Sequence, residues 1–229
     1  MITCTSHDFA VTNIYEESRA SISGFTYLRR RVSLSSVIRT IMSEQEDYVF
    51  FWKINEVQYV NRTSANINNL VIQSGWGSQW YKSEFTVKLR FEEGGEEEEV
   101  TFPSAEHWMM VRKALLFGDA EKAREILGVP DDMGAVKALG RQVRNFDEAV
   151  WVGARQGIVL EGNMHKFGQN EELRAKLLAT GTRRLVEASP RDRVWGIGFG
   201  ARNALKNRGH WGLNLLRLET RRLVDRGKH

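Results

Sequence analysis

The stretch that decides the fold is Glu84–Phe117, which reads EFTVKLRFEEGGEEEEVTFPSAEHWMMVRKALLF. Its first eight residues alternate apolar and polar side chains, a pattern that predicts a strand with one buried face. Gly94 and Gly95 mark a turn, and residues 99–102 predict the returning strand of an antiparallel hairpin. Residues 92–99 contain six Glu, which repel one another, so we expect this turn to be solvated.

The pattern becomes helical at Pro103, where Ser104 is the expected N-cap of a helix over residues 105–117. Aromatic and β-branched residues predict strands over residues 48–52, 69–72 and 184–188. Further helices are predicted over residues 119–127, 132–139, 146–158, 169–179 and 212–226, with Gly162-Asn163 among the expected stops. We therefore predict one α+β domain over residues 47–229, mainly helical with a small, mostly antiparallel sheet, after an N-terminal extension of uncertain structure, residues 1–46.

The composition indicates a globular protein: of 229 residues, 41% are hydrophobic and 27% charged. The single Cys4 excludes an internal disulfide, and no Cys or His cluster has zinc-ligand spacing, so we expect neither a metal nor a cofactor. The apolar runs are too short for a membrane helix, which predicts a soluble, cytoplasmic protein without a membrane partner. Residues 18–41, with five Arg, six Ser and no acid, leave organelle targeting as the less favoured alternative, because acidic residues precede them.

The C-terminal part of the chain is basic. Residues 183–229 hold ten Arg and two Lys against four acids, a local charge of +8 that could attract a polyanion such as RNA. Much of this charge lies at helical spacing and lacks interleaved exposed aromatic residues, so a solvated helix face is the favoured interpretation.

Glu106 and Lys113 are the first candidates for chemistry. They lie seven residues apart, two helical turns and about 10.5 Å of rise, so both project from one face together with Met110 and Phe117. If that face is buried, desolvation raises the pKa of the carboxyl group and lowers that of the amine, and both shifts favour catalysis. The alternative is a solvated face at the edge of the core.

Two further features could contact a ligand. Residues 192–200 present Asp192 and Trp195 on a turn with alternating glycines, but the spacing does not fit a dinucleotide fingerprint, because residue 201 is Ala. Trp151 and Arg155 share a helix face, which suits a phosphoribosyl group or a flat base, and equally a pair at the edge of the core.

Residues 162–170 are rich in hydrogen-bonding groups, and we expect a ligand-contacting loop there, with Lys166 and Phe167. Trp76, Trp80 and Trp108 are counted as core. The sequence contains no G-x-S-x-G elbow, P-loop or H-E-x-x-H motif, which argues against a serine hydrolase, a P-loop NTPase and a zinc protease.

Taken together, these segments resemble the YbiA-like or NADAR family over residues 48–224. The resemblance is carried by collinear segments: the strand around Phe51, Gly77-Ser-Gln-Trp-Tyr81, Ser104-Ala-Glu-His-Trp108 with Lys113, Gly140-Arg141, Trp151 with Arg155, Lys166-Phe167 before Gln169-Asn170, and Glu187-Ala-Ser-Pro-Arg-Asp192 before Trp195-Gly196. One departure is Ser78-Gln79-Trp80, where family members usually have Ser-Asn-Phe.

The resemblance implies a compact α+β fold with N-glycosidase activity. One branch of the family cleaves ribosylated pyrimidine intermediates of riboflavin biosynthesis, and another removes ADP-ribose from guanine bases. By position, Glu106, Trp151 and Asp192 match residues regarded as essential, and Lys113 matches a lysine implicated as a Schiff-base nucleophile. The implied partner is a ribosylated base or an ADP-ribosylated nucleobase, free or within nucleic acid.

The expected site follows from these observations. The catalytic candidates are Glu106, Lys113, Asp192 and Trp151. The substrate-binding candidates are Trp80, Arg141, Arg155, Lys166, Phe167, Asn170, Trp195 and Gly196. Two alternatives remain open: a non-catalytic module that binds NAD or ADP-ribose through the same residues, and an RNA-binding protein that uses the basic C-terminal part.

Overall fold

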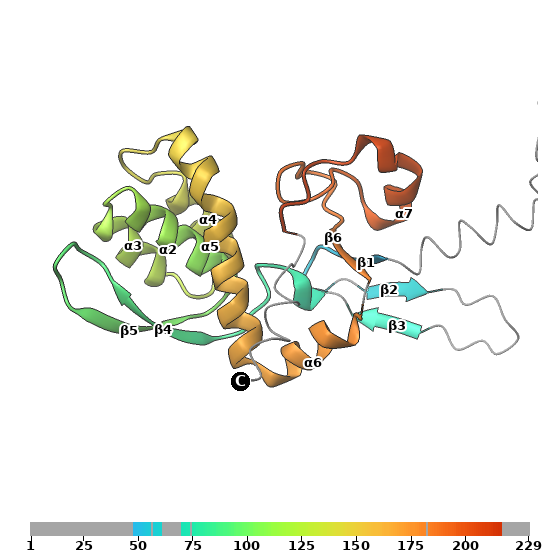
Figure 1. The fold of residues 1–229 in the computed structure, drawn as a ribbon, viewed down its shortest axis with the longest axis horizontal. Helices are drawn as coiled ribbons and strands as arrows, with labels where there is room; N and C mark the ends of the chain where they lie inside the picture. Colours follow the sequence, from blue (N-terminus) through green and yellow to red (C-terminus); the bar gives the residue numbers. More distant parts are fainter. Residues whose placement is uncertain (1–47, 56, 61–69, 74, 182, 217–229) are drawn as a thin grey trace, which may run out of the picture.

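A computed structural model describes residues 48–55, 57–60, 70–73, 75–181 and 183–216 (Figure 1). The N-terminal extension with the possible targeting segment lies outside these residues, and so do residues 217–229 of the basic C-terminal part.

The hairpin at the centre of the sequence forms as predicted. Strands β4 (Phe85–Arg90) and β5 (Glu97–Phe102) pair in antiparallel orientation, with Phe85 opposite Phe102. Both of these rings are buried, whereas residues 92–99 at the tip are exposed. The acidic stretch is therefore solvated, because its charges face water.

The other described strands also occur in pairs. Strands β2 (Val57–Val60) and β3 (Leu70–Gln73) are antiparallel. Strands β1 (Tyr48–Phe51) and β6 (Arg184–Glu187) are parallel, and this pairing brings Phe51 opposite Glu187. The α+β class is confirmed, with small sheets of two strands each rather than one sheet.

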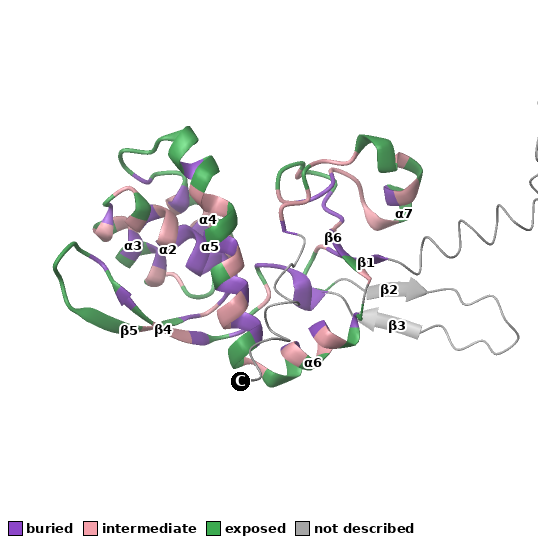
Figure 2. Ribbon diagram, in the orientation of Figure 1, coloured by how far each residue is buried: buried purple, intermediate pink, exposed green. Residues whose placement is uncertain are grey.

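Helix α2 (Ala105–Leu116) is the central element of the helical half. It packs against α3 (Ala120–Leu127), α4 (Met133–Gly140) and α5 (Glu148–Gln169), and Figure 2 shows buried residues along α2 and α5 where they meet. Ser104 accepts a hydrogen bond from the backbone N–H of His107, so the predicted N-cap of α2 is confirmed.

The remaining described helices are short. They are η1 (Gly75–Gly77), α6 (Glu171–Ala179), α7 (Ala201–Ala204) and η2 (Leu205–His210). In Figure 1, α2, α3, α4 and the β4–β5 hairpin lie on one side of α5, whereas β1, β6, β2, β3 and α7 lie on the other.

The predicted stop at Gly162-Asn163 is wrong, and so is the predicted loop over residues 162–170. Helix α5 continues to Gln169 because Gly162 serves helix packing instead of termination. A Cβ atom at Gly162 would lie 2.4 Å from Cδ1 of Trp108, whose indole N–H donates to the carbonyl oxygen of Ile158 at 2.8 Å. The glycine therefore lets α5 approach the Trp108 ring on α2.

The predicted helix over residues 212–226 does not begin at residue 212. Residues 212–216 run beside the loop of residues 193–197 instead. The backbone N–H of Leu213 donates to the carbonyl oxygen of Arg193, and that of Leu216 to Trp195. These bonds run at successive residues along both segments, so residues 212–214 follow the neighbouring loop and have no regular secondary structure.

Candidate active site

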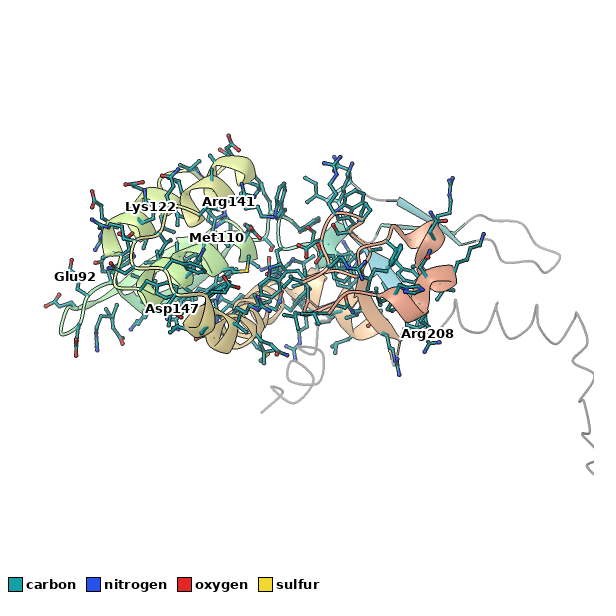
Figure 3. The ribbon with its side chains drawn as sticks, turned by 90° about the horizontal axis from the view of Figure 1, so that it is seen from above. Glu92, Met110, Lys122, Arg141, Asp147 and Arg208 are labelled. Carbon is teal, nitrogen blue, oxygen red and sulfur yellow. The ribbon has the colours of Figure 1, made fainter. Side chains whose placement is uncertain are left out.

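A cavity of about 910 Å³ lies between the helical half and the half that contains β1 and β6. Its walls come from α2, α4 and the start of α5 on one side, and from the segments after β1, η1 and β6 on the other. In Figure 3, Met110 and Arg141, which both line the cavity, lie on the side of the helices that faces the other half.

Glu106 lies in the first turn of α2 and is 3% exposed. Among the described residues, its Oε1 atom has no hydrogen-bond partner. Burial raises the pKa of Glu106 to about 7, the nearby charge of Asp192 adds to the shift, and the charge of Lys137 and a hydrogen bond from the Trp80 side chain oppose it. The group can therefore hold a proton near neutral pH.

Glu187, the last residue of β6, is a second carboxyl group in this cavity; it is half-buried, and the sequence analysis did not select it. Its Oε2 atom has no partner among the described residues. Burial and the charges of Asp192 and Glu106 raise the pKa of Glu187 to about 8, although Lys137 opposes the shift. The available signal was its position: a charged residue that ends an apolar strand and begins the segment leading to Asp192.

Asp192 is held by its own loop. Its Oδ1 atom accepts hydrogen bonds from the backbone N–H groups of Val194 and Trp195, both at 2.8 Å. The loop lies close to β6 because residue 196 is Gly, where a Cβ atom would be only 2.8 Å from the carbonyl oxygen of Glu187. This arrangement fixes Asp192 and leaves Oδ2 without a hydrogen bond from the described residues.

Lys113 lines the same cavity, two turns after Glu106. Its ammonium group donates to the carbonyl oxygen of Gly140 at 2.7 Å and lies 4.3 Å from the ring centroid of Phe146 and 5.6 Å from that of Trp151. Burial lowers the pKa of Lys113, the charge of Arg141 lowers it further, and Glu148 opposes the shift. Both pKa shifts on this helix face have the expected directions.

The aromatic residues of the cavity differ in exposure. Trp151 is buried and Trp195 half-buried, and both line the cavity. Trp80 also lines it but is 39% exposed, with Lys137 5.5 Å from its ring centroid, so the expectation that Trp80 belongs to the core is wrong. Its side chain instead lies at the cavity, where it donates a hydrogen bond to the Glu106 carboxyl group.

Arg155 does not pair with Trp151 as the helical spacing suggested. The cation over the Trp151 ring is Lys113, whereas the Arg155 guanidinium lies 5.8 Å from the ring centroid of Trp195. Arg155 is not among the residues that line the cavity, whereas Arg141 is.

Four other predicted substrate-binding residues, Lys166, Phe167, Asn170 and Gly196, also lie outside the cavity lining. Lys166 is fully buried and donates to the carbonyl oxygens of Trp76 and Ser78, both at 2.8 Å, and burial lowers its pKa to about 7. The Phe167 ring packs against Trp76, and Asn170 donates to the carbonyl oxygens of Glu84 and Lys166.

Lys166 nevertheless influences the cavity indirectly. Ser78, one of the residues whose carbonyl oxygen it holds, lines the cavity and is followed by Gln79 and Trp80. The Lys166 ammonium group therefore fixes the backbone that carries the Gln79 and Trp80 side chains. The cavity is also lined by three cations that the sequence analysis did not select: Lys53, Lys137 and Arg191.

In the part of the chain that the structure describes, no group of three His, Cys, Asp or Glu side chains is arranged to hold a metal ion. No helix within the described ranges is both long enough and apolar enough to cross a membrane.

The chain is similar to several known proteins. The NADAR domain family matches residues 50–218. N-glycosidase R617 of Acanthamoeba polyphaga mimivirus is 39% identical over 175 residues, which are 76% of this chain and 92% of that protein. N-glycosidase YbiA of Shigella boydii serotype 4 (strain Sb227) is 33% identical over 108 residues, which are 47% of this chain and 64% of that protein. The NMR structure of the E. coli protein YbiA is 23% identical, with a TM-score of 0.47, and the match covers 77% of this chain and 95% of that one.

Proposed function

The chain belongs to the NADAR domain family, and we propose on that basis that it is an N-glycosidase that hydrolyses the C–N bond between a ribose and a base. The proposed substrates are phosphoribosylated or ADP-ribosylated bases, either ribosylaminopyrimidine intermediates of riboflavin biosynthesis or ADP-ribosyl-guanine. The observation that carries the proposal is the buried carboxyl group of Glu106, whose pKa is raised to about 7, in one cavity with Asp192 and Lys113.

Cleavage of a glycosidic C–N bond requires a proton for the departing base. Glu106 can supply it, because its pKa of about 7 leaves part of the carboxyl group protonated at neutral pH, ready for transfer to the leaving nitrogen. Asp192 is the anionic partner: its loop holds Oδ1, and Oδ2 is placed to orient the ribose hydroxyl groups or to polarise water. O-glycosidases also use one carboxyl group as the acid and a second one as an anion.

Lys113 is the proposed nucleophile. Its neutral amine forms a bond to C1′ while the bond from C1′ to the base breaks, and the base leaves with the proton of Glu106. The sugar ring then opens to an imine between C1′ and Nζ, with O4′ taking up a proton. Water adds to C1′, the amine departs, and the free sugar and unmodified Lys113 result. The lowered pKa of Lys113 supports this role because only the neutral amine can attack.

The rest of the cavity suits the other parts of such a substrate. Trp151 and Trp195 offer aromatic faces for the base or the sugar. The cations Lys53, Lys137, Arg141 and Arg191 offer partners for one or two phosphate groups.

The test offers the full-length protein a panel of ribosylaminopyrimidine phosphates and ADP-ribosylated guanine, and follows release of ribose 5-phosphate or ADP-ribose. We expect hydrolysis of at least one member, and a loss of about two to four decades in kcat for Glu106→Gln, the usual contribution of a general acid. Glu171→Gln is the matched control, because Glu171 also lies in the first turn of a helix but is exposed and outside the cavity lining.

Two results would contradict the proposal. Normal turnover by Glu106→Gln would remove Glu106 from the mechanism. ADP-ribose binding without hydrolysis of any panel member would instead favour the non-catalytic binding module.

A further inference from the structure

Three acceptor oxygens in the described residues are buried, lack a hydrogen-bond partner and belong to residues that line the cavity: Gln79 Oε1, Glu106 Oε1 and Glu187 Oε2. The two carboxyl groups have raised pKa values and can exchange a proton with a substrate. An amide oxygen binds no proton near neutral pH, so Gln79 has no such explanation. A buried acceptor without a partner weakens a fold and therefore calls for a functional reason.

The orientation of the Gln79 amide is fixed by a chain of hydrogen bonds. Asn163, which is 2% exposed, donates from Nδ2 to the carbonyl oxygen of Val159, one turn earlier on α5, at 3.0 Å. That carbonyl can only accept, so the oxygen of Asn163 must face Gln79. Gln79 Nε2 donates to it at 2.9 Å, and Oε1 is left free.

The backbone of Gln79 is fixed as well. Its carbonyl oxygen accepts from the backbone N–H of Glu106 at 3.0 Å, and Lys166 holds the preceding carbonyl, that of Ser78. The Gln79 side chain is only 6% exposed. The protein thus holds a rigid acceptor in the lining of the cavity that contains the proposed proton donor, and such preorganisation is typical of a recognition group.

Building on the proposed function, we propose that Gln79 determines specificity: its Oε1 atom accepts a hydrogen bond from an N–H group of the departing base or an O–H group of the ribose. Because Asn163 prevents the Gln79 amide from flipping, the atom presented to the substrate is always the oxygen. Gln79 therefore favours substrates with an N–H or O–H group facing Oε1. It disfavours analogues that present a second acceptor or no polar group there, because Oε1 then stays buried and unpaired.

The experiment measures equilibrium binding of four probes to the full-length wild-type protein and to Gln79→Met, which keeps the shape of the side chain and removes the amide. Ribose 5-phosphate and ADP-ribose carry the sugar without the base, whereas a diaminopyrimidinone and guanine carry the base without the sugar. We expect Gln79→Met to weaken one of these pairs about tenfold to hundredfold, and the affected pair identifies the donor as O–H or N–H.

Two further variants guard against an effect on folding. Gln79→Asn keeps the amide but withdraws it by one methylene from Asn163 and from the cavity, so it should stay folded, with a lower melting temperature than the wild type, and bind the same pair of probes more weakly. Gln156→Met, an exposed position of α5 outside the cavity, should leave all affinities unchanged.

The proposal is overturned if Gln79→Met binds all four probes as tightly as the wild type does, or if the wild type binds none of them. Because binding is measured without turnover, this outcome is distinct from failure of the proposed N-glycosidase activity, which the substrate panel reports separately.

Discussion

At the scale of single residues, Lys113 contacts neutral groups and not a carboxylate in the described part of the chain. Its ammonium group meets the carbonyl oxygen of Gly140 and the faces of Phe146 and Trp151, and no carboxylate among the described residues forms an ion pair with it. Burial lowers the pKa of Lys113, and these contacts oppose that shift less than a salt bridge would. A reactive lysine needs this property.

We predict that borohydride added during turnover traps a covalent adduct on Lys113. Reduction of the imine between C1′ and Nζ gives a stable secondary amine, which peptide mass spectrometry locates. Lys137→Met should still be trapped, because Lys137 lines the cavity without being the proposed nucleophile. Lys113→Met should yield no adduct. An adduct on another lysine, or turnover without any trapping, would contradict the imine route.

Residue spacing shows which parts of the site are visible in a sequence. Glu106 and Lys113 could be paired in advance, because two helical turns place them on one face. Glu187 and Lys137 could not, because their proximity to Glu106 depends on α4 packing against α2 and on β6 lying across the cavity from α2. The fixed orientation of the Gln79 amide is also invisible in a sequence, because it depends on Asn163 from a distant helix.

At the scale of elements, α5 shows why a glycine in a sequence is ambiguous. Gly162 and Gly157 are both interior to the helix, but Gly162 is buried against Trp108, whereas Gly157 is exposed and a Cβ atom added there would have no neighbour within 4 Å. Helix starts were easier to predict, because Ser104, Asp119, Asp132 and Asp147 cap their helices through local hydrogen bonds.

This difference predicts opposite effects of the same substitution. Gly162→Ala should lower the free energy of unfolding by about 1–3 kcal/mol, because its Cβ would overlap the Trp108 ring. Gly157→Ala should raise it by about 0.5–1 kcal/mol, because alanine favours the helix and meets nothing. Urea denaturation followed by circular dichroism measures both. Equal effects of the two substitutions would mean that Gly162 is not a packing glycine.

At the scale of the whole molecule, the cavity gathers carboxyl groups from opposite walls. Glu106 stands on the helical half, whereas Glu187 and Asp192 belong to β6 and its following loop. The described structure therefore holds two carboxyl groups, the buried Glu106 and the half-buried Glu187, whose pKa values are raised to about 7 and about 8. Folding keeps protons on them that the unfolded chain would release.

The consequence is a stability that depends on pH. Unfolded Glu titrates near 4.5, so each raised pKa contributes stability that is fully present below about pH 4.5 and is lost as pH rises through 7 for Glu106 and 8 for Glu187. Glu106→Gln and Glu187→Gln should each stabilise the protein at pH 8.5 relative to the wild type, by about 1–3 kcal/mol, and by much less at pH 5.

The comparison uses differences between variant and wild type because Lys166 acts in the opposite direction. Its pKa is lowered to about 7, so it contributes stability that increases as pH rises above 7. Denaturant unfolding at pH 5, 7 and 8.5 measures the difference in free energy of unfolding between each variant and the wild type. The control Glu171→Gln should show no pH-dependent difference. A difference that does not change with pH would show that Glu106 and Glu187 titrate normally.

The parallel pair of β1 and β6 also sets the order of events during synthesis. Tyr48–Phe51 leave the ribosome early, but their partner Arg184–Glu187 emerges only after the entire helical half has been made. The helical half can condense around Trp108 while the nascent chain is still growing, since its hairpin and helices are contiguous in sequence. Until translation passes β6, the apolar edge of Tyr48–Phe51 has no strand to pair with, and in that interval the nascent chain is most exposed to aggregation and most in need of a chaperone.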